Sequence, residues 1–231
     1  MPMNFSSDNV SGVCPEIAAA VIAANEGPAM PYGNDEATRK IKSAIQELFE
    51  TEADVFLLAT GTAANALSLS VITPPYGSIY CHPKAHLQID ECGAPEFYTG
   101  GAKLVLMPDR AGKISADDLA DALKNEKGDV HHVKPAVVSI TQMSETGAVY
   151  SIGEIKAITT VAHNHGLKVH IDGARLANAV AALDCSPADI TTKTGIDVLT
   201  FGASKNGAFS SEAVILFTPG LAKDFAYRRK R

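Results

Sequence analysis

The chain has 231 residues, of which 46% are hydrophobic, 20% charged and 6% aromatic, with no tryptophan. This length and composition are typical of one large globular α/β domain, or of one domain with a fragment of a second. The formal net charge of -6 argues against a nucleic-acid partner, because the one basic cluster, YRRKR at 227–231, is typical of a solvated helix end.

The cysteines and the N-terminus indicate the compartment. Cys14, Cys81, Cys92 and Cys185 are scattered without a C-x-x-C pair, which favours reduced thiols. The stretch MPMNFSSDNVSG at the start lacks the basic region and apolar core of a signal peptide, and no run reaches the ~18 apolar residues of a membrane span. We therefore expect a cytoplasmic protein without a membrane partner.

The chain begins with two helical patterns. They are PEIAAAVIAANEG at 15–27 and DEATRKIKSAIQELFE at 35–50, separated by PAMPYGN. Residues 1–50 are therefore predicted to form an N-terminal helical segment.

Short, continuously apolar runs then predict strands that are covered on both faces. These runs are VFLLA (55–59), KLVLM (103–107), AVVSI (136–140), LKVHI (167–171), VLTF (198–201) and AVILF (213–217). Because helical patterns alternate with these runs, the strands are expected to be parallel and joined by crossover helices.

The intervening helices carry start and stop signals. Ser115 is a candidate N-cap with Asp118 three residues on, and Ser151 is another, followed by Glu154. Gly166 is a candidate C-cap for the second of these helices. The last residues, GLAKDFAYRRKR, predict a helix that is still running where the sequence stops.

Residues that follow strands are the candidates for chemistry, since ligands of parallel α/β sheets bind beyond the carboxyl ends of the strands. After VFLLA comes TGTAANAL (60–67), a turn of small residues into a helix start, which suits a phosphate. A simple N-cap is the alternative interpretation. After LKVHI come Asp172 and, one helical turn on, Arg175; a structural ion pair or helix cap is the alternative there.

Lys205 follows VLTF within the segment GASKNGAF. It is either an exposed loop charge or an amine held in a confined site, where it can form a Schiff base. A phosphate turn, a buried carboxylate and a reactive lysine are together the three anchors that pyridoxal phosphate needs. Its aldehyde forms an imine with lysine, its pyridine nitrogen stays protonated against a carboxylate, and its phosphate needs backbone donors. The sequence therefore predicts pyridoxal phosphate as the cofactor.

Further segments extend this pattern over nearly the whole chain. They are FSSDN (5–9), PYGNDEATRKI (31–41), ATGTAANALSL (59–69), HPKAHLQIDECGAPEFYTGGAKL (82–104), HIDGARLANA (170–179) and TFGASKNG (200–207). In these segments the chain resembles the threonine aldolase and β-eliminating lyase family of pyridoxal-phosphate enzymes, which has the aspartate aminotransferase fold, fold type I.

The resemblance implies a domain organisation. Residues 51–220 would be the cofactor-binding large domain, with a mostly parallel sheet flanked by helices, and residues 221–231 the truncated start of an interdomain helix. Family members continue into a small C-terminal domain, which supplies another arginine for the substrate carboxylate. That domain is expected to be missing here.

The resemblance also implies roles for cofactor-binding residues. Gly61, Thr62 and Ser204 would face the phosphate. Asp172 would hold the pyridine nitrogen, and Lys205 would form the imine with the cofactor.

Further roles concern the substrate. His86 would stack on the pyridine ring and could help to move the proton of the substrate hydroxyl. Arg175 would lie beside the phenolic oxygen of the cofactor or the substrate carboxylate. Ser7, Tyr32 and His131 match family positions at the mouth of the active site.

Structural interpretations of these side chains stay open. His82 and His86 are four residues apart and could ligate a metal, but no third ligand is apparent, so no metal is expected. His131 is also typical of a loop, and Tyr32 could cover a hydrophobic edge. The helix dipole alone would explain a pair of histidines, His163 and His165, at a helix C-terminus.

The activity implied is cleavage of L-threonine and L-allo-threonine to glycine and acetaldehyde, in which His86 or an ordered water removes the β-hydroxyl proton. A homodimer or homotetramer, with active sites at the interface, is implied as well. Two alternatives remain: β-elimination from another amino acid, and an inactive cofactor-binding fragment.

Overall fold

One seven-stranded sheet, in the order β1-β7-β6-β5-β4-β2-β3, forms the centre of the chain. The computed structural model describes residues 4, 6–124, 126 and 128–231. The strands are β1 (Asp54–Leu58), β2 (Gly77–Cys81), β3 (Lys103–Leu106), β4 (Lys134–Thr141), β5 (Lys168–Gly173), β6 (Val198–Gly202) and β7 (Glu212–Leu216). Strands β3, β2, β4, β5 and β6 are parallel neighbours, whereas β7 runs antiparallel to both β6 and β1.

The strand predictions are confirmed at every apolar run, and the sheet is mostly parallel as expected. The sequence did not reveal β2, because its segment GSIYC begins with glycine and serine and has only a short apolar part. It also did not reveal the reversed direction of β7. A short loop, rather than a crossover helix, joins β6 to β7 and makes this pair antiparallel.

Helices surround the sheet. They are α1 (Pro15–Ala24), α2 (Glu36–Leu48), α3 (Gly61–Ile72), α4 (His86–Ile89), α5 (Ala94–Thr99), α6 (Ala116–Lys124), α7 (Ile152–Asn164), α8 (Leu176–Leu183) and α9 (Phe225–Lys230). The predicted caps are confirmed: Ser115 Oγ accepts the Asp118 N–H at 3.1 Å, and Ser151 and Glu154 form a capping box. Gly166 follows α7 with a positive φ of 76°, which suits glycine.

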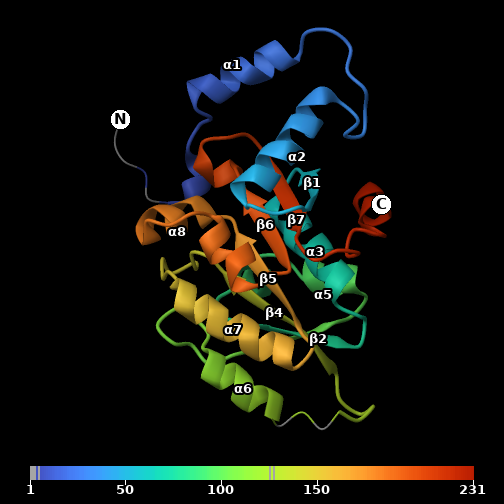
Figure 1. Ribbon diagram of the computed structural model, residues 1–231, viewed down its shortest axis with the longest axis vertical. Coiled ribbons are helices and arrows are strands. Elements are labelled where there is room, and N and C mark those ends of the chain that lie inside the picture. The colour runs from blue at the N-terminus through green and yellow to red at the C-terminus, as the bar shows by residue number, and fades with distance from the viewer. Residues whose placement is uncertain (1–3, 5, 125, 127) are drawn as a thin grey trace.

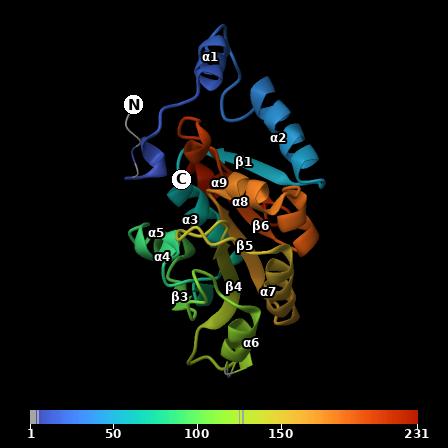
Figure 2. The same ribbon diagram turned by 90° about the vertical axis from the view of Figure 1, so that its left-hand side faces the viewer.

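The chain is built in three layers (Figures 1 and 2). Helices α6, α7 and α8 cover one face of the sheet, where their apolar residues pack in one core cluster with Val169 and Ile171 of β5. Helices α3 and α5 lie on the opposite face, where a second cluster includes Leu67 of α3 and Val198 of β6. Both faces of the central strands are therefore buried, as their continuous apolar runs predict.

Beneath α3 the sheet carries buried polar side chains beside the apolar cluster. His170 of β5 is fully buried, with Nδ1 2.9 Å from Ser139 Oγ and Nε2 3.1 Å from Thr200 Oγ1. Thr200 Oγ1 lies 3.4 Å from Ser68 Oγ of α3. Burial lowers the pKa of His170 to about 4, so the imidazole is neutral at physiological pH. This polar layer connects α3 to β4, β5 and β6 without adding a charge.

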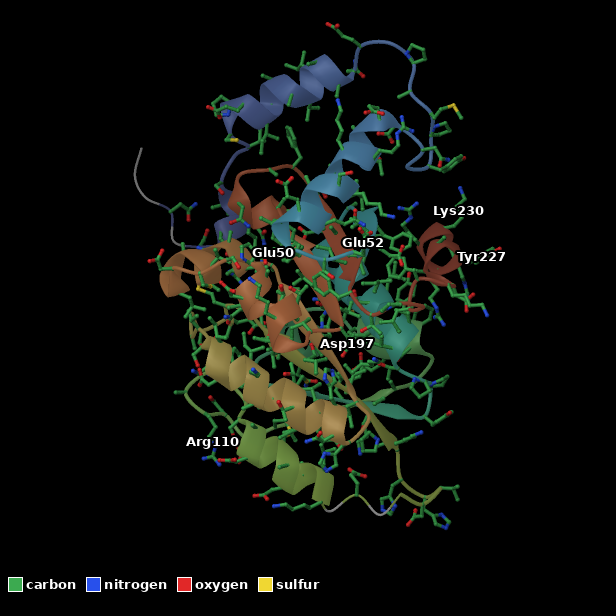
Figure 3. All side chains as sticks on the ribbon, in the orientation of Figure 1. Glu50, Glu52, Arg110, Asp197, Tyr227 and Lys230 are labelled. Atoms are coloured by element: carbon green, nitrogen blue, oxygen red, sulfur yellow. The ribbon has the colours of Figure 1, made fainter. Side chains whose placement is uncertain are left out.

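The two ends of the chain differ in how they pack. Helix α1 buries none of its residues and lies apart from the sheet in Figure 1. In α9, by contrast, Phe225 is fully buried and stacks on Phe56 of β1, with 4.4 Å between ring centroids. Tyr227 and Lys230 of α9 point away from the sheet in Figure 3. The domain boundaries at residues 50 and 220 stay a prediction.

Asp197 is a buried polar junction at the amino end of β6 (Figure 3). Its carboxylate accepts hydrogen bonds from Lys168 Nζ at 2.8 Å and the Val169 N–H at 2.9 Å, and lies 2.9 Å from His163 Nε2. His163 thus has a specific partner in addition to the helix dipole. Within the described residues, no helix is both long and apolar enough to cross a membrane.

Replacing the cap residue, Ser151→Ala, should lower stability by about 1 kcal/mol, because the Glu154 N–H loses its acceptor. For a chain of this size the melting temperature should then fall by roughly 2–4 °C in a thermal unfolding experiment. Thr160→Ala on the exposed side of the same helix is the control and should change stability by less than about 0.5 kcal/mol. Equal effects of the two changes would contradict the capping assignment.

Candidate active site

A cavity of about 390 Å³ lies where the carboxyl ends of β4, β5 and β6 meet the N-terminus of α3. The volume is within the range of roughly 300–1,000 Å³ that small-molecule sites have. Asp172, Lys205 and His86 all line the cavity, as do Gly61 and Thr62. The structure therefore brings together residues that the sequence analysis took from separate segments.

The N-terminus of α3 forms one wall of the cavity. Thr60 is the N-cap residue, and its Oγ1 accepts the Ala63 N–H at 3.2 Å. Gly61 and Thr62 are the first helical residues, so their N–H groups have no acceptor within the helix. No heavy atom lies within 4 Å of the position that a Cβ would take at Gly61. The wall thus offers free backbone donors and the positive end of a helix dipole to an anion.

Asp172 is buried at the carboxyl end of β5, with 3% of its surface exposed. One carboxylate oxygen, Oδ1, accepts the Ala174 N–H at 3.0 Å. The other, Oδ2, accepts a hydrogen bond from Asn65 Nδ2 at 2.9 Å. These two donors orient the carboxylate at the floor of the cavity.

Lys205 and Ser204 belong to a short 3-10 turn, Ser204–Asn206, just after β6. Lys205 Nζ makes no hydrogen bond or ion pair with any residue that the structure describes, although Asp172 lines the same cavity. Ser204 Oγ accepts the Ser211 N–H at 3.2 Å and thereby closes the loop before β7. An amine without a partner in a small cavity is a candidate nucleophile.

His86 begins α4 and is held at two points. Its backbone N–H donates to Glu145 Oε1 at 2.7 Å, and its ring Nδ1 lies 2.8 Å from Glu91 Oε1. The Glu91 side chain is fully buried, and this burial raises its pKa. The hydrogen bond with Glu91 raises the pKa of His86 above its ordinary value. His86 and Glu91 therefore form one hydrogen-bonded pair beside the cavity.

Arg175 follows β5 as the N-cap residue of α8 and also lines the cavity. It donates to Asp8, from Nε at 2.6 Å and from Nη2 at 3.2 Å. Partial burial opposes ionisation of Asp8, but the hydrogen bonds and the charge of Arg175, together with the charge of Lys205, outweigh it and lower the Asp8 pKa. The ion pair attaches the N-terminal segment to the mouth of the cavity.

Three predicted residues do not line the cavity in this single chain. Ser7 is exposed and caps the 3-10 turn that contains Asp8, whereas Phe5 of the same motif lies outside the described residues. Tyr32 is 73% exposed, and Lys230 Nζ lies 4.3 Å from its ring centroid. His131 precedes β4, which has 8 residues. The carboxyl end of β4 reaches the cavity, and the strand rises ~3.3 Å per residue. The length of β4 therefore separates His131 from the cavity edge.

Sequence reasoning missed several residues of the site. Asn65 was detectable, because it is a polar residue one turn into an otherwise apolar helix start. Glu91, five positions after His86, carried no comparable signal in the sequence. Glu212 is the charged residue that opens β7. It escaped notice because only residues after strands were considered, whereas the antiparallel direction of β7 brings its first residue to the same edge.

Glu212 is 6% exposed and lines the cavity, and its Oε2 atom has no hydrogen-bond partner among the described residues. Burial raises the pKa of its carboxyl group.

The donor set of the cavity suits an organic anion rather than a metal ion. The described residues contain no group of three or more histidine, cysteine, aspartate or glutamate side chains that could hold a metal. His82 Nδ1 instead accepts the Lys84 N–H at 3.1 Å. Free N–H groups, an unpaired amine and an oriented carboxylate can respectively bind a phosphate, an aldehyde and a protonated ring nitrogen.

Comparisons with known proteins point in the same direction. The model of the β-eliminating lyase family matches residues 4–230. The chain is 46% identical over 228 residues to the low specificity L-threonine aldolase of Pseudomonas aeruginosa, an alignment that covers 98% of this chain and 65% of that protein. The chain thus spans about two thirds of the length of this relative.

Solved structures agree on the fold. The threonine aldolase of Leishmania major superposes with a TM-score of 0.90 at 30% identity, over 99% of this chain and 67% of that one. An archaeal alanine:glyoxylate aminotransferase, at 16% identity, has a TM-score of 0.71 over 93% of this chain and 54% of its own, and shows the fold alone. The fold class expected from the sequence is confirmed.

The raised pKa of Glu212 predicts how stability depends on pH. The folded chain binds this proton more tightly than the unfolded chain, so the stabilisation is fully present below the unfolded pKa of ~4.3 and is lost as pH rises through the folded pKa. Glu212→Gln should therefore raise the melting temperature at pH 7 but leave it unchanged near pH 4. The control Glu47→Gln, on the exposed side of α2, should have no such pH-dependent effect. A lower melting temperature of Glu212→Gln at pH 7 would contradict this assignment.

Proposed function

The chain belongs to the β-eliminating lyase family, and we propose that it uses pyridoxal phosphate to cleave L-threonine and L-allo-threonine to glycine and acetaldehyde. The observation that carries this proposal is the unpaired amine of Lys205, in one cavity with the oriented carboxylate of Asp172 and the N-terminus of α3. The match to relatives named threonine aldolase supports the choice of substrate.

The cofactor would be held by residues that line this cavity. The N–H groups of Gly61 and Thr62, with the Ser204 hydroxyl, would bind its phosphate. Lys205 would supply the amine for its aldehyde. When bound, pyridoxal phosphate supplies the electron sink that allows the Cα–Cβ bond of a β-hydroxy amino acid to break.

The side chains of the chain manage protons and orientation in this proposal. Asp172, fixed by Asn65 and the Ala174 N–H, holds a proton on the pyridine nitrogen. His86, or a water ordered near it, takes the proton of the substrate hydroxyl. Arg175 binds the substrate carboxylate or the phenolic oxygen of the cofactor.

An assembly of two or four copies belongs to the same proposal. Ser7, Tyr32 and His131 do not line the cavity within one chain, which supports such an assembly, because a second copy could complete the site with these residues. The unburied helix α1, with Ile22 74% exposed, offers apolar surface for such an association.

The first test is release of glycine and acetaldehyde from L-threonine by the purified chain supplied with pyridoxal phosphate. Lys205→Ala should lower the rate roughly 10³-fold or more, as loss of a covalent nucleophile does. The control Lys42→Ala removes an exposed lysine of α2 and should keep the full rate. Ammonia and a 2-keto acid as products would instead favour β-elimination. Cofactor binding without any product would favour the inactive fragment.

Asp172→Asn tests the role of the buried carboxylate. The amide cannot stabilise a protonated ring nitrogen, so the rate should fall roughly 10²-fold or more while the chain still folds. Circular dichroism and the absorbance of bound cofactor check folding and loading. Full activity of Asp172→Asn would contradict the assignment.

A further inference from the structure

A chain of hydrogen bonds connects His86 to Asp172 beneath the cavity. His86 Nδ1 lies 2.8 Å from Glu91 Oε1, and Asn65 Nδ2 donates to the same oxygen at 2.7 Å. Asn65 Nδ2 donates also to Asp172 Oδ2 at 2.9 Å. Glu91 has no role in the proposed function so far, yet its side chain has no exposed surface, and Asn65 beside it is 1% exposed.

This arrangement fixes which ring nitrogen of His86 can react. A side-chain amide has two N–H bonds, and Asn65 directs both at carboxylates, so neither is available to the imidazole. Glu91 contacts the His86 ring at Nδ1, the nitrogen on the buried side of the ring. A carboxylate accepts hydrogen bonds only, so Nδ1 must carry a proton. In the neutral imidazole Nε2 is then the acceptor, and His86, with 34% of its side chain exposed, lines the cavity.

We propose that Glu91 is a positioning residue, which keeps a proton on Nδ1 of His86 and so makes Nε2 the base that receives the proton of the substrate hydroxyl. The inference rests on the proposed function and deepens it, because it chooses His86 over an ordered water. An orienting carboxylate of this kind holds one tautomer and stabilises the imidazolium that forms on proton transfer.

The proton transfer balances. The O–H bond of the substrate breaks, its electron pair stays on oxygen, and its proton forms a bond to Nε2 while Nδ1 keeps its own. The carboxylate of Glu91 then faces a positive imidazolium. The substrate hydroxyl loses one proton, and Cα of the product glycine gains one. The overall reaction therefore needs no oxidant or further reactant.

The other charges around His86 are compatible with this role. The hydrogen bond with Glu91 is the main cause that raises the His86 pKa; burial opposes it, Asp172 adds to the rise and Lys205 reduces it. Glu145 contacts the His86 backbone N–H and not the ring. Of the groups that face His86, Glu91 is thus the one whose removal should change the ring most.

The tautomer of His86 in the unmodified chain is the first test and needs no turnover. Nitrogen-15 NMR at a pH above the midpoint of the His86 titration, with the signal assigned by its loss in His86→Gln, should show the proton on Nδ1. A proton on Nε2 would overturn the inference. The tautomer itself is measured on the unmodified chain, so only the signal assignment depends on a variant.

Glu91→Gln, which keeps the side-chain shape, is the second test. The midpoint of the His86 titration should move to lower pH, and the acid side of the kcat/KM profile should move with it. Loss of an oriented base should also lower kcat roughly 10²-fold or more. Glu145→Gln is the matched control and should leave the His86 midpoint in place. A fall in kcat with an unmoved midpoint in Glu91→Gln would show a merely structural role and overturn the inference.

The inference and the proposed function can fail separately. If the unmodified chain releases no glycine, the proposed function is contradicted, and the tautomer and the titration still decide whether Glu91 positions His86. If glycine is released but Nε2 carries the proton, the function stands and Glu91 is not the positioning residue.

Discussion

Two carboxyl groups, on Asp172 and Glu91, are buried below the same cavity, and the side-chain amide of Asn65 lies between them. Burial of acids near each other is costly, and Glu91 shows this cost as a raised pKa. Three groups offset this cost. The Asn65 amide donates to both acids, the Ala174 N–H donates to Asp172, and His86 pairs with Glu91. Removing the amide would leave two buried acids without their shared donor.

The position of Asn65 in turn depends on how α3 is attached to the sheet. Polar side chains between the helix and the sheet, Ser68, Thr200 and His170, form a hydrogen-bonded layer beside the apolar core. Because His170 is neutral at physiological pH, this layer adds no charge under Asp172. The layer thus fixes the register of α3 on β5 and β6, and the same helix presents its first N–H groups to the cavity.

Local patterns sufficed to predict the strands other than β2, the caps and the residues that follow β5 and β6, since each depends on neighbours in sequence. Contacts between distant segments did not follow from such patterns: Asn65 and Asp172 are 107 positions apart. Glu212 was missed because strand direction is a tertiary property, decided by the short loop before β7. His131 was assigned by family position, and a single chain does not bring it to the cavity.

The N-terminal segment adds a constraint on how a substrate could bind. Asp8 occupies Nε and Nη2 of Arg175, the two donors that make one bidentate face of the guanidinium. A carboxylate that binds Arg175 must therefore use the remaining N–H groups, two on Nη1 and one on Nη2, or displace Asp8. Since Asp8 belongs to a short 3-10 turn that buries none of its residues, displacement would disturb little packing. The ion pair thus couples the position of the N-terminal segment to the occupancy of Arg175.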